Sequence, residues 1–471
     1  MINYRPTLQP LLPTWQHVKR CTQVIHTATT TEAQRISGGK HDRIGVSHNH
    51  ESRCSPRLAS SSRQPSGGIH GNDHDMYGGC RQSTRLATLA SMSNTVTIPE
   101  SMLPRDGRFG SGPSKIRPEQ VQALDAGATK LLGTSHRQAP VKQLVGSIRE
   151  GLAQFFTIPD GYEVVLGNGG ATAFWDMACA SLITRKAAFG VYGSFSEKFA
   201  IEADKTPFLE KPEIFRSEPG TYRLPELTEY VDTYCWAHNE TSTGVATPVK
   251  RIPGSIEQGA ITLVDATSGA GVLPVDISQT DAYYFSPQKA FGSDGGLWIA
   301  ILSPAAIERA YALEESTKLE GARRWVPAFL SLKSAIDNSR KDQTLNTPSV
   351  ANLIMLENQI RWLNDNGGLA WAHARCAKSA SLLYQWAERS EYAHPFVEDE
   401  SARSTATVTI DLDDAISAKQ VIQALRDNGI VDTGGYRKLG RNQLRIGVFP
   451  SVEPSDIVAL TKCVDYIVEH L

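Results

Sequence analysis

The sequence lacks several features that would assign it to a specialised class of protein. Its 471 residues contain no apolar run of about 18 residues, which argues against a membrane-spanning helix. Basic and acidic residues nearly balance, at 48 against 50, whereas a dedicated nucleic-acid binder usually carries a strong basic excess. The seven cysteines are scattered and form no CxxC pair, so reduced thiols fit better than a disulfide framework or a metal site. The composition is typical of a soluble enzyme, and the chain is long enough to form two domains.

Residues 1–95 differ from the rest of the chain. They contain eleven Lys and Arg against five Asp and Glu, and seven of the twelve histidines. Their apolar residues follow neither a helical nor a strand period, so the segment cannot bury enough surface to offset the entropy lost on ordering. We therefore expect 1–95 to be a largely disordered extension.

Several interpretations of this extension stay open. It is rich in Arg and Ser and poor in acidic residues, as organellar transit peptides are, but it lacks the apolar run of a secretory signal. Its His and basic residues are of types that bind metals or nucleic acids, although in no regular spacing. Met92 begins a stretch that reads like the natural start of a cytosolic enzyme. We favour an upstream extension without function.

From about residue 116 to 310, helical patterns alternate with short apolar runs. This alternation predicts a mainly parallel sheet that helices cover on both faces. The expected helices are 118–132 and 141–156, and the expected strands are 163–166, 187–192, 232–237, 260–264, 282–285 and 297–302. A smaller α+β domain is expected to end the chain, with helices at 349–363, 369–389, 418–428 and 454–471 and strands at 407–411 and 444–448.

Three motifs follow one another in an order that indicates a cofactor site. The glycine-rich turn 167–172 precedes an expected helix, whose free N–H groups suit a phosphate, and it matches neither a dinucleotide-binding nor a P-loop motif. Asp265 ends an expected buried strand, where a carboxylate can pair with a protonated pyridine nitrogen. Lys289 follows 24 positions later, after an aromatic strand. A lysine held near a positively charged ring should have a lowered pKa and could condense with an aldehyde.

Each of these motifs also has an ordinary structural explanation. The glycines could do no more than form a tight turn, Asp265 could simply cap a turn of its own, and Lys289 could be a solvated charge. Their order and spacing favour a site in which Lys289 holds pyridoxal phosphate as a Schiff base.

Around these residues the chain resembles fold-type I pyridoxal-phosphate enzymes, specifically phosphoserine aminotransferases of the actinobacterial kind. The resemblance implies an α/β fold with a large cofactor-binding domain over 96–365, built on a mostly parallel seven-stranded sheet, and a smaller α+β domain over 366–471. It spans 97–471 and leaves 1–95 unmatched. The matching stretches are RFGSGPSK (108–115), GTSHRQAPV (133–141), GNGGATAFWD (167–176), WAHNETSTGV (236–245), DATSGAG (265–271), YYFSPQK (283–289), NTPS (346–349) and YRKLGRNQLRIG (436–447).

The resemblance implies roles for the matching residues. Lys289 becomes the Schiff-base lysine and Asp265 the partner of the pyridinium nitrogen, and the two form the catalytic pair. Phe195 occupies the place of an aromatic ring, often Trp in relatives, that stacks on the pyridine ring. The remaining implied cofactor contacts are Ala171, Thr172 and Gln288 at the phosphate, Thr241 at the 3-hydroxyl, and Asn346 and Thr347, which would reach the phosphate in the neighbouring subunit of a homodimer.

Substrate binding follows from charge. Phosphoserine and 3-phosphooxypyruvate carry a carboxylate and a phosphate, and glutamate and 2-oxoglutarate carry two carboxylates, so a site for both pairs needs guanidinium groups. The resemblance assigns substrate binding to four residues: His136, Arg137, Arg437 and Arg445. Tyr436 departs from the His found in relatives, which leaves the phosphate contact at that position open.

The implied reaction is ping-pong transfer of an amino group from L-glutamate to 3-phosphooxypyruvate, in cytoplasmic L-serine biosynthesis, with the hydroxythreonine phosphate of pyridoxine biosynthesis as a further candidate substrate. A serine–glyoxylate type aminotransferase is the nearest alternative. A cysteine desulfurase would need a mobile-loop cysteine, whereas Cys376 lies in a helical pattern. A scaffold protein on a retired enzyme fold stays open as well, although the presence of Asp265 and Lys289 argues against it.

Overall fold

The computed structural model describes residues 96–315 and 324–471, all within one compact unit, Leu89–Leu471. The extension 1–95, which we expected to be disordered, lies outside the described residues. No helix in the described ranges is long and apolar enough to cross a membrane. Four cysteines fall in these ranges, and all four are free and buried, as expected for reduced thiols: Cys179, Cys235, Cys376 and Cys463.

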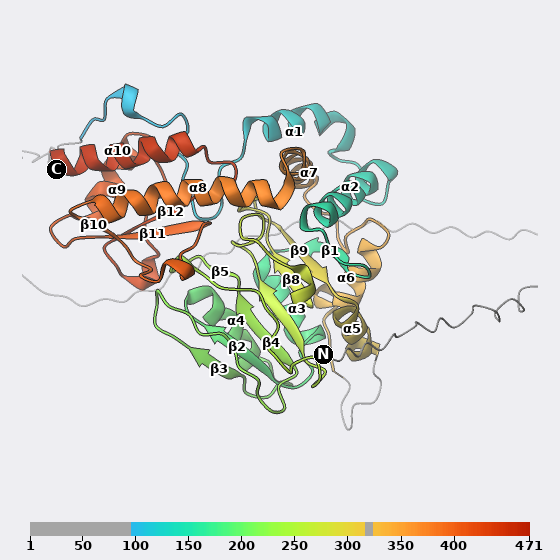
Figure 1. Ribbon diagram of the computed structural model, residues 1–471. Helices are drawn as coiled ribbons and strands as arrows, with labels where there is room; N and C mark the ends of the chain where they lie inside the picture. Colours follow the sequence, from blue (N-terminus) through green and yellow to red (C-terminus); the bar gives the residue numbers. More distant parts are fainter. Residues whose placement is uncertain (1–95, 316–323) are drawn as a thin grey trace, which may run out of the picture. The chain divides into compact units, whose positions relative to one another are not determined.

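The larger sheet has seven strands in the order β1-β9-β8-β7-β4-β2-β3 (Figure 1). Five neighbouring strands, β8 to β3 in that order, run parallel, whereas β9 is antiparallel to both β1 and β8. The prediction of a mainly parallel sheet is confirmed. The strands are β1 (Glu163–Asn168), β2 (Ala187–Val191), β3 (Glu213–Arg216), β4 (Thr233–Ala237), β7 (Ile261–Asp265), β8 (Ala282–Phe285) and β9 (Leu297–Leu302).

Helices cover both faces of this sheet. Every residue of β2, β4, β8 and β9 is buried, as is typical of strands covered on both sides. One face packs against α2 (Ala139–Phe156) and α7 (Val350–Asp365), and α1 (Pro118–Leu131) packs on α7. The other face packs against α3 (Ala171–Ser181), α4 (Ser194–Lys205), α5 (Pro304–Glu315) and α6 (Leu332–Ser339).

A second, antiparallel sheet of three strands lies in the C-terminal part: β10 (Ala393–Pro395), β11 (Thr407–Leu412) and β12 (Gln443–Gly447). It shares a core with α9 (Ala418–Asp427), α10 (Pro454–His470) and the second half of α8 (Gly368–Arg389). Ala372 and Cys376, from the first half of α8, belong to the core of the larger sheet instead. The single helix α8 therefore contributes to both cores, and Figure 1 shows this helix running from the three-stranded sheet toward α7.

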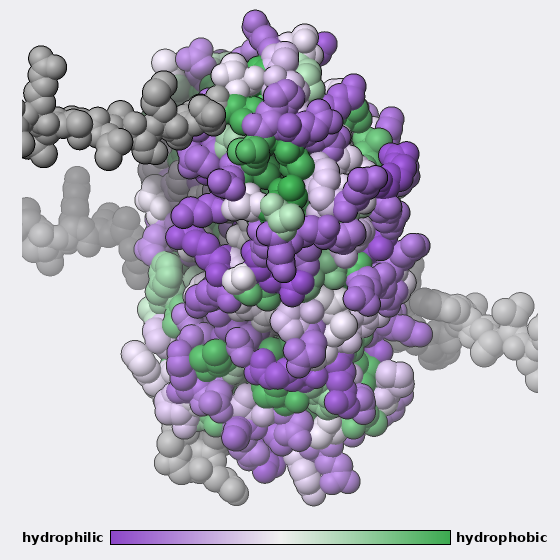
Figure 2. Space-filling model, turned by 90° about the vertical axis from the view of Figure 1, so that its left-hand side faces the viewer, coloured by the Kyte–Doolittle hydropathy of each residue, from purple (hydrophilic) through white to green (hydrophobic). Residues whose placement is uncertain are grey.

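Most boundaries agree with the expected ones to within two residues. The sequence patterns did not predict α4, α5, α6, β3 or β10. The four residues of β3 alternate between half-buried and exposed at the edge of the sheet, so they lack the continuous apolar run that identified the other strands. On the face shown in Figure 2, hydrophobic residues form small groups among hydrophilic ones, which is normal for a protein surface.

Candidate active site

A cavity of about 390 Å³ lies where three strands of the larger sheet end. Ala237 ends β4, Asp265 ends β7, and Lys289 follows β8. The carboxyl ends of parallel strands meet at one edge of a sheet, and this edge is where open α/β sheets bind ligands. The lining residues are Ser111, Gly112, Gly170, Ala171, Thr172, Trp175, Phe195, Ala237, Asn239, Thr241, Asp265, Thr267, Ser268, Ser286, Gln288, Lys289, Tyr436 and Arg445.

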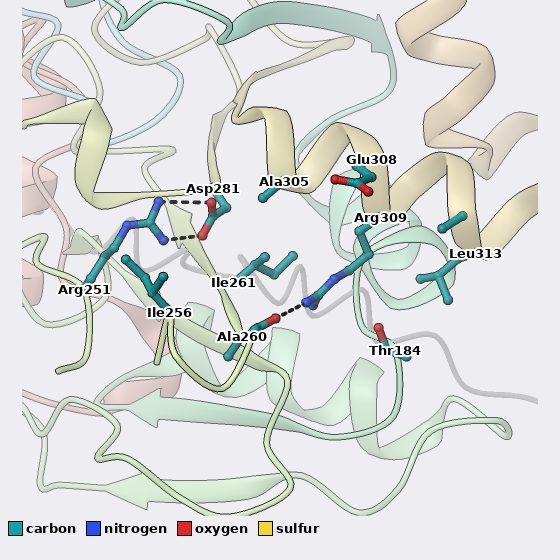
Figure 3. A pocket seen from close by; sticks show the side chains of 12 residues that line it. Thr184, Arg251, Ile256, Ala260, Ile261, Asp281, Ala305, Glu308, Arg309 and Leu313 are labelled. Carbon is teal, nitrogen blue, oxygen red and sulfur yellow. Dashed lines mark hydrogen bonds and ion pairs between the residues drawn. The ribbon is translucent and has the colours of Figure 1, made fainter. Parts of the chain in front are cut away.

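A larger hollow of about 700 Å³ lies at the other end of the parallel strands, beside the first residue of β7 (Figure 3). Its guanidinium groups are already paired. Arg251 forms a bidentate ion pair with Asp281, and Arg309 Nη2 donates to the carbonyl oxygen of Gly259 at 2.6 Å. None of the residues singled out from the sequence lines this hollow. The smaller cavity is therefore the candidate active site.

Lys289 is buried at the wall of the cavity, with 7% of its surface exposed. Its Nζ donates to Thr241 Oγ1 at 2.7 Å. Burial lowers the pKa of Lys289 to about 8; the negative charges of Asp265 and Glu240 oppose this shift, and the positive charge of Arg445 adds to it. A lysine with this pKa offers the neutral, nucleophilic amine near physiological pH.

Both carboxylate oxygens of Asp265 are held by hydrogen bonds. Trp175 Nε1 donates to Oδ2, and the backbone N–H of Thr267 donates to Oδ1, each at 2.9 Å. Each oxygen keeps a second lone pair, with which the carboxylate can accept a hydrogen bond from a protonated ring nitrogen.

The first turn of α3 forms one end of the cavity. Ala171 and Thr172 open this helix, and the first N–H groups of a helix have no partner within it. Their partial positive charge suits an anion such as a phosphate. Gln288 also lines the cavity, and its Oε1 is buried without a hydrogen-bond partner among the described residues.

Phe195 contributes an aromatic ring from the start of α4. Lys289 Nζ lies 5.5 Å from the centroid of this ring, and the ring of Tyr436 lies 5.8 Å from it, centroid to centroid. The fully buried carboxylate of Glu240 accepts hydrogen bonds from the backbone N–H groups of Phe195 and Ser196. The backbone that carries the ring is therefore fixed.

Arg445 brings a guanidinium group from β12 to the cavity. Its Nη1 donates to the carbonyl oxygen of Thr241 at 3.3 Å, and its Cζ lies 5.5 Å from the centroid of the Tyr436 ring. Its Nε is buried and has no hydrogen-bond partner among the described residues. Burial lowers the pKa of Arg445, but a guanidinium stays charged at neutral pH. Its unused donors fit an anionic ligand.

The cavity fits pyridoxal phosphate, the cofactor that the resemblance implies. Lys289 offers a buried amine for the aldehyde, Asp265 a carboxylate for the ring nitrogen, Phe195 a ring for stacking, and α3 a helix start for the phosphate. The buried Gln288 Oε1 and Arg445 Nε, which have no hydrogen-bond partner in the described part of the chain, are what a site built for a polar ligand should contain.

The other predicted residues are not among those that line this cavity. His136 and Thr347 line a separate hollow of about 570 Å³, and their side chains are hydrogen-bonded, with 3.1 Å between Nδ1 and Oγ1. Arg137 Nη1 donates to Gln343 Oε1 at 3.2 Å. Asn346 precedes Thr347 and lines neither cavity, and Arg437 begins the short turn Arg437–Leu439 without lining the Lys289 cavity. Within one chain these five residues do not join Lys289, and their roles stay predictions.

Several residues of the cavity were not predicted from the sequence. Trp175 belongs to a stretch that matched the family, yet no role followed from the match. Ser268 accepts hydrogen bonds from Asn239 Nδ2 and Thr241 Oγ1, at 2.8 and 2.7 Å. At Gly112 a Cβ atom would stand 2.6 Å from Lys289 Cε, so the glycine makes room for the lysine. These contacts join segments that are far apart in the chain, so no local sequence pattern predicts them.

Comparisons with known proteins identify the family of this chain. Residues 216–438 match the family model described as Aminotransferase class-V. Phosphoserine aminotransferases from Rhodococcus opacus (strain B4) and Rhodococcus jostii (strain RHA1) are each 55% identical to this chain over 380 residues, which is 81% of this chain and 100% of theirs. The solved structure of a phosphoserine aminotransferase from Cytophaga hutchinsonii is 24% identical, with a TM-score of 0.69, and the match covers 76% of this chain and 99% of that one. That structure supports the fold, and the two close relatives identify the family: the chain belongs to the phosphoserine aminotransferases, which are class V, pyridoxal-phosphate-dependent aminotransferases.

Proposed function

We propose that this enzyme catalyses the reversible transfer of an amino group between L-glutamate and 3-phosphooxypyruvate, giving O-phospho-L-serine and 2-oxoglutarate. The observation that carries the proposal is the cavity in which buried Lys289 lies beside Asp265 and the incompletely paired guanidinium of Arg445. We place the reaction in cytoplasmic L-serine biosynthesis. The phosphorylated hydroxythreonine of pyridoxine biosynthesis has the same carboxylate and phosphate groups, so it is a second candidate substrate.

When bound, pyridoxal phosphate supplies an electron-withdrawing ring that weakens the Cα–H bond of the amino acid. The protein residues bind, orient and move protons around it. The carboxylate of Asp265, held at both oxygens, keeps the ring nitrogen protonated. The Nζ atom of Lys289 would take the Cα proton of the amino donor and deliver it to the C4′ carbon of the cofactor, and in the reverse half-reaction it would carry a proton from C4′ to the Cα of the product.

Arg445 is the substrate-binding group that this cavity contains. A guanidinium with unused donors in a buried setting binds a carboxylate or a phosphate through charge-assisted hydrogen bonds. Tyr436 packs between Arg445 and Phe195, with its ring 5.5 Å from the guanidinium carbon and 5.8 Å from the Phe195 ring. We propose that Tyr436 orients Arg445 rather than contacting the substrate phosphate through a charge, as a His would.

A second copy of the chain completes the site in this proposal. His136, Arg137, Asn346 and Thr347 lie away from the Lys289 cavity of their own chain, so we propose that they act at the cavity of a neighbouring copy in a homodimer. Mixing tests this. A Lys289→Ala chain and an Asn346→Ala/Thr347→Val chain, each inactive alone, would form mixed dimers in which one site is intact. Activity should return on mixing and subunit exchange, whereas sites confined to one chain would stay inactive.

A two-substrate assay with O-phosphoserine and 2-oxoglutarate tests the reaction itself. The proposal predicts turnover with parallel lines in double-reciprocal plots, because the first product leaves before the second substrate binds. Turnover on serine or alanine with none on O-phosphoserine would favour a serine–glyoxylate type enzyme. A desulfurase is disfavoured by Cys376, which is buried within α8 with its pKa raised by burial and is therefore a poor nucleophile.

A further inference from the structure

Trp175 is a residue of the cavity to which the proposed chemistry gives no role. It lies in the first half of α3, four residues after Ala171, and only 4% of its surface is exposed. Its indole Nε1 donates to Asp265 Oδ2 at 2.9 Å. An indole N–H can only donate, so this contact is directed toward the charged form of the carboxylate.

The indole ring has little freedom to leave this position. It is stacked on the ring of Phe199 from α4, with 6.0 Å between centroids and 13° between ring planes. Phe199 is itself buried and forms an edge-to-face contact with Phe189, which lies in β2 of the larger sheet. Two helices and a strand therefore fix the donor before any ligand binds.

The opposite oxygen of Asp265 is fixed independently. The backbone N–H of Thr267 donates to Oδ1 at 2.9 Å, and that amide belongs to the turn that directly follows β7. With one bond at each oxygen, the carboxylate cannot rotate about its Cβ–Cγ bond without breaking a charge-assisted hydrogen bond.

We propose that Trp175 is a positioning residue that sets both the orientation and the proton affinity of the Asp265 carboxylate, and through it the hold of the enzyme on the cofactor ring. The inference rests on the proposed cofactor role of Asp265. A carboxylate that loses a donor becomes more basic and free to turn. It then draws the proton away from the ring nitrogen and holds the ring less firmly, so both the electron-withdrawing power of the ring and the retention of the cofactor decrease.

Trp175→Phe removes the N–H donor and keeps an aromatic ring on Phe199. A hydrogen bond to a charged group of this kind corresponds to about a tenfold change in an equilibrium or rate. We therefore expect kcat to fall about tenfold and the cofactor to leave the diluted holoenzyme about tenfold faster. KM for both substrates should change less than about twofold, because the arginines that bind the substrate are untouched.

Trp386→Phe is the matched control. Trp386 also donates its Nε1 to an aspartate, Asp465 Oδ1 at 2.8 Å, but in the core of the small sheet. This variant loses the same kind of bond, and its kcat and cofactor release should stay at the wild-type values.

A double-mutant cycle separates positioning from packing. In an Asp265→Asn background Trp175 has no carboxylate to act on, so Trp175→Phe should accelerate cofactor release no further. An equal acceleration in both backgrounds would assign Trp175 to packing alone and overturn the proposal, as would unchanged release from the Trp175→Phe enzyme. If Trp175→Phe does not fold, Phe199→Leu loosens the same indole and should accelerate release in the same direction; unchanged release there would equally overturn the proposal.

Cofactor release does not depend on the amino-acid substrate. An enzyme inactive on O-phosphoserine but sensitive to Trp175→Phe in cofactor release would contradict the proposed reaction and leave the role of Trp175 standing. If the enzyme is active on O-phosphoserine but Trp175→Phe leaves cofactor release unchanged, the proposed reaction stands and the role of Trp175 is contradicted.

Discussion

Replacing Glu240 by Gln should reveal how a buried charge organises the cavity. The carboxylate is fully buried, and no cation among the described residues forms an ion pair with it. Its oxygens accept instead from the backbone N–H groups of Phe195, Ser196 and Ser242 and from the two serine hydroxyls, at 2.6 to 3.2 Å. Three of these donors lie at the start of α4, where the helix dipole also favours a negative charge.

The magnitude follows from this set of donors. A Gln side chain has one acceptor oxygen, so at least one backbone N–H loses its partner, which is unfavourable by about 1–3 kcal/mol. The remaining bonds lose their charge assistance, but the neutral amide also avoids the desolvation of a buried charge. We expect Glu240→Gln to lower the free energy of unfolding by about 2 kcal/mol. The Phe195 ring should also lose its fixed position, and cofactor release from the holoenzyme should accelerate about three- to tenfold.

Urea unfolding and absorbance-monitored release of the cofactor would measure the two effects, and Asp232→Asn is the control. Asp232 also accepts from three backbone N–H groups, those of Thr184, Arg185 and Lys186, but it precedes β4, at the end of the strand away from the cavity. Its replacement should lower stability while leaving cofactor release unchanged. Faster release from both variants, or from neither, would refute the link between Glu240 and the Phe195 ring.

Two further predictions concern Lys289 and Arg445. Because the pKa of Lys289 is lowered to about 8, its capture of added pyridoxal phosphate by cofactor-free enzyme should accelerate as the pH rises toward about 8 and then level off. Stopped-flow absorbance would measure this capture, and a midpoint near pH 10.5 would contradict the lowered pKa. As the pH is raised, the folded state loses the Lys289 proton near pH 8, whereas the unfolded state loses it near pH 10.5. Lys289 therefore makes the cofactor-free enzyme more stable as the pH rises from about 8 to about 10.5. Arg445→Met should raise KM for both O-phosphoserine and 2-oxoglutarate about tenfold or more. Arg441→Met removes a guanidinium that pairs with Asp411 outside the cavity and should leave KM unchanged, so equal effects of the two variants in steady-state assays would count against Arg445 as the substrate-binding group.

The sequence predicted the larger sheet and the meeting of Asp265 and Lys289 at one cavity, for a physical reason. Strands buried on both faces read as continuous apolar runs, and residues that follow them must meet at one edge of the sheet. Asp265 and Lys289 each follow such a run, so their proximity could be inferred from order alone. Phe195 and Thr241 came from the family resemblance, and the cavity contains both.

The contacts that orient these residues could not be predicted in the same way. Trp175 and Asp265 are 90 residues apart, and their hydrogen bond depends on how α3 packs on the sheet. Glu240 reads as one more charged residue until α4, which the sequence patterns missed, places backbone N–H groups against it. His136 and Thr347 meet each other away from Lys289, and a single sequence does not distinguish residues of one chain's site from those of a neighbour's.

Reduction of the holoenzyme with borohydride, followed by peptide mass mapping, tests the central claim most directly. Borohydride converts a lysine–pyridoxal phosphate bond into a stable amine, so the modified lysine can be located. The structure predicts that the label lies on Lys289, whose amine is buried in the cavity beside Asp265. A label on another lysine, such as Lys115, or a holoenzyme without any label, would contradict the account.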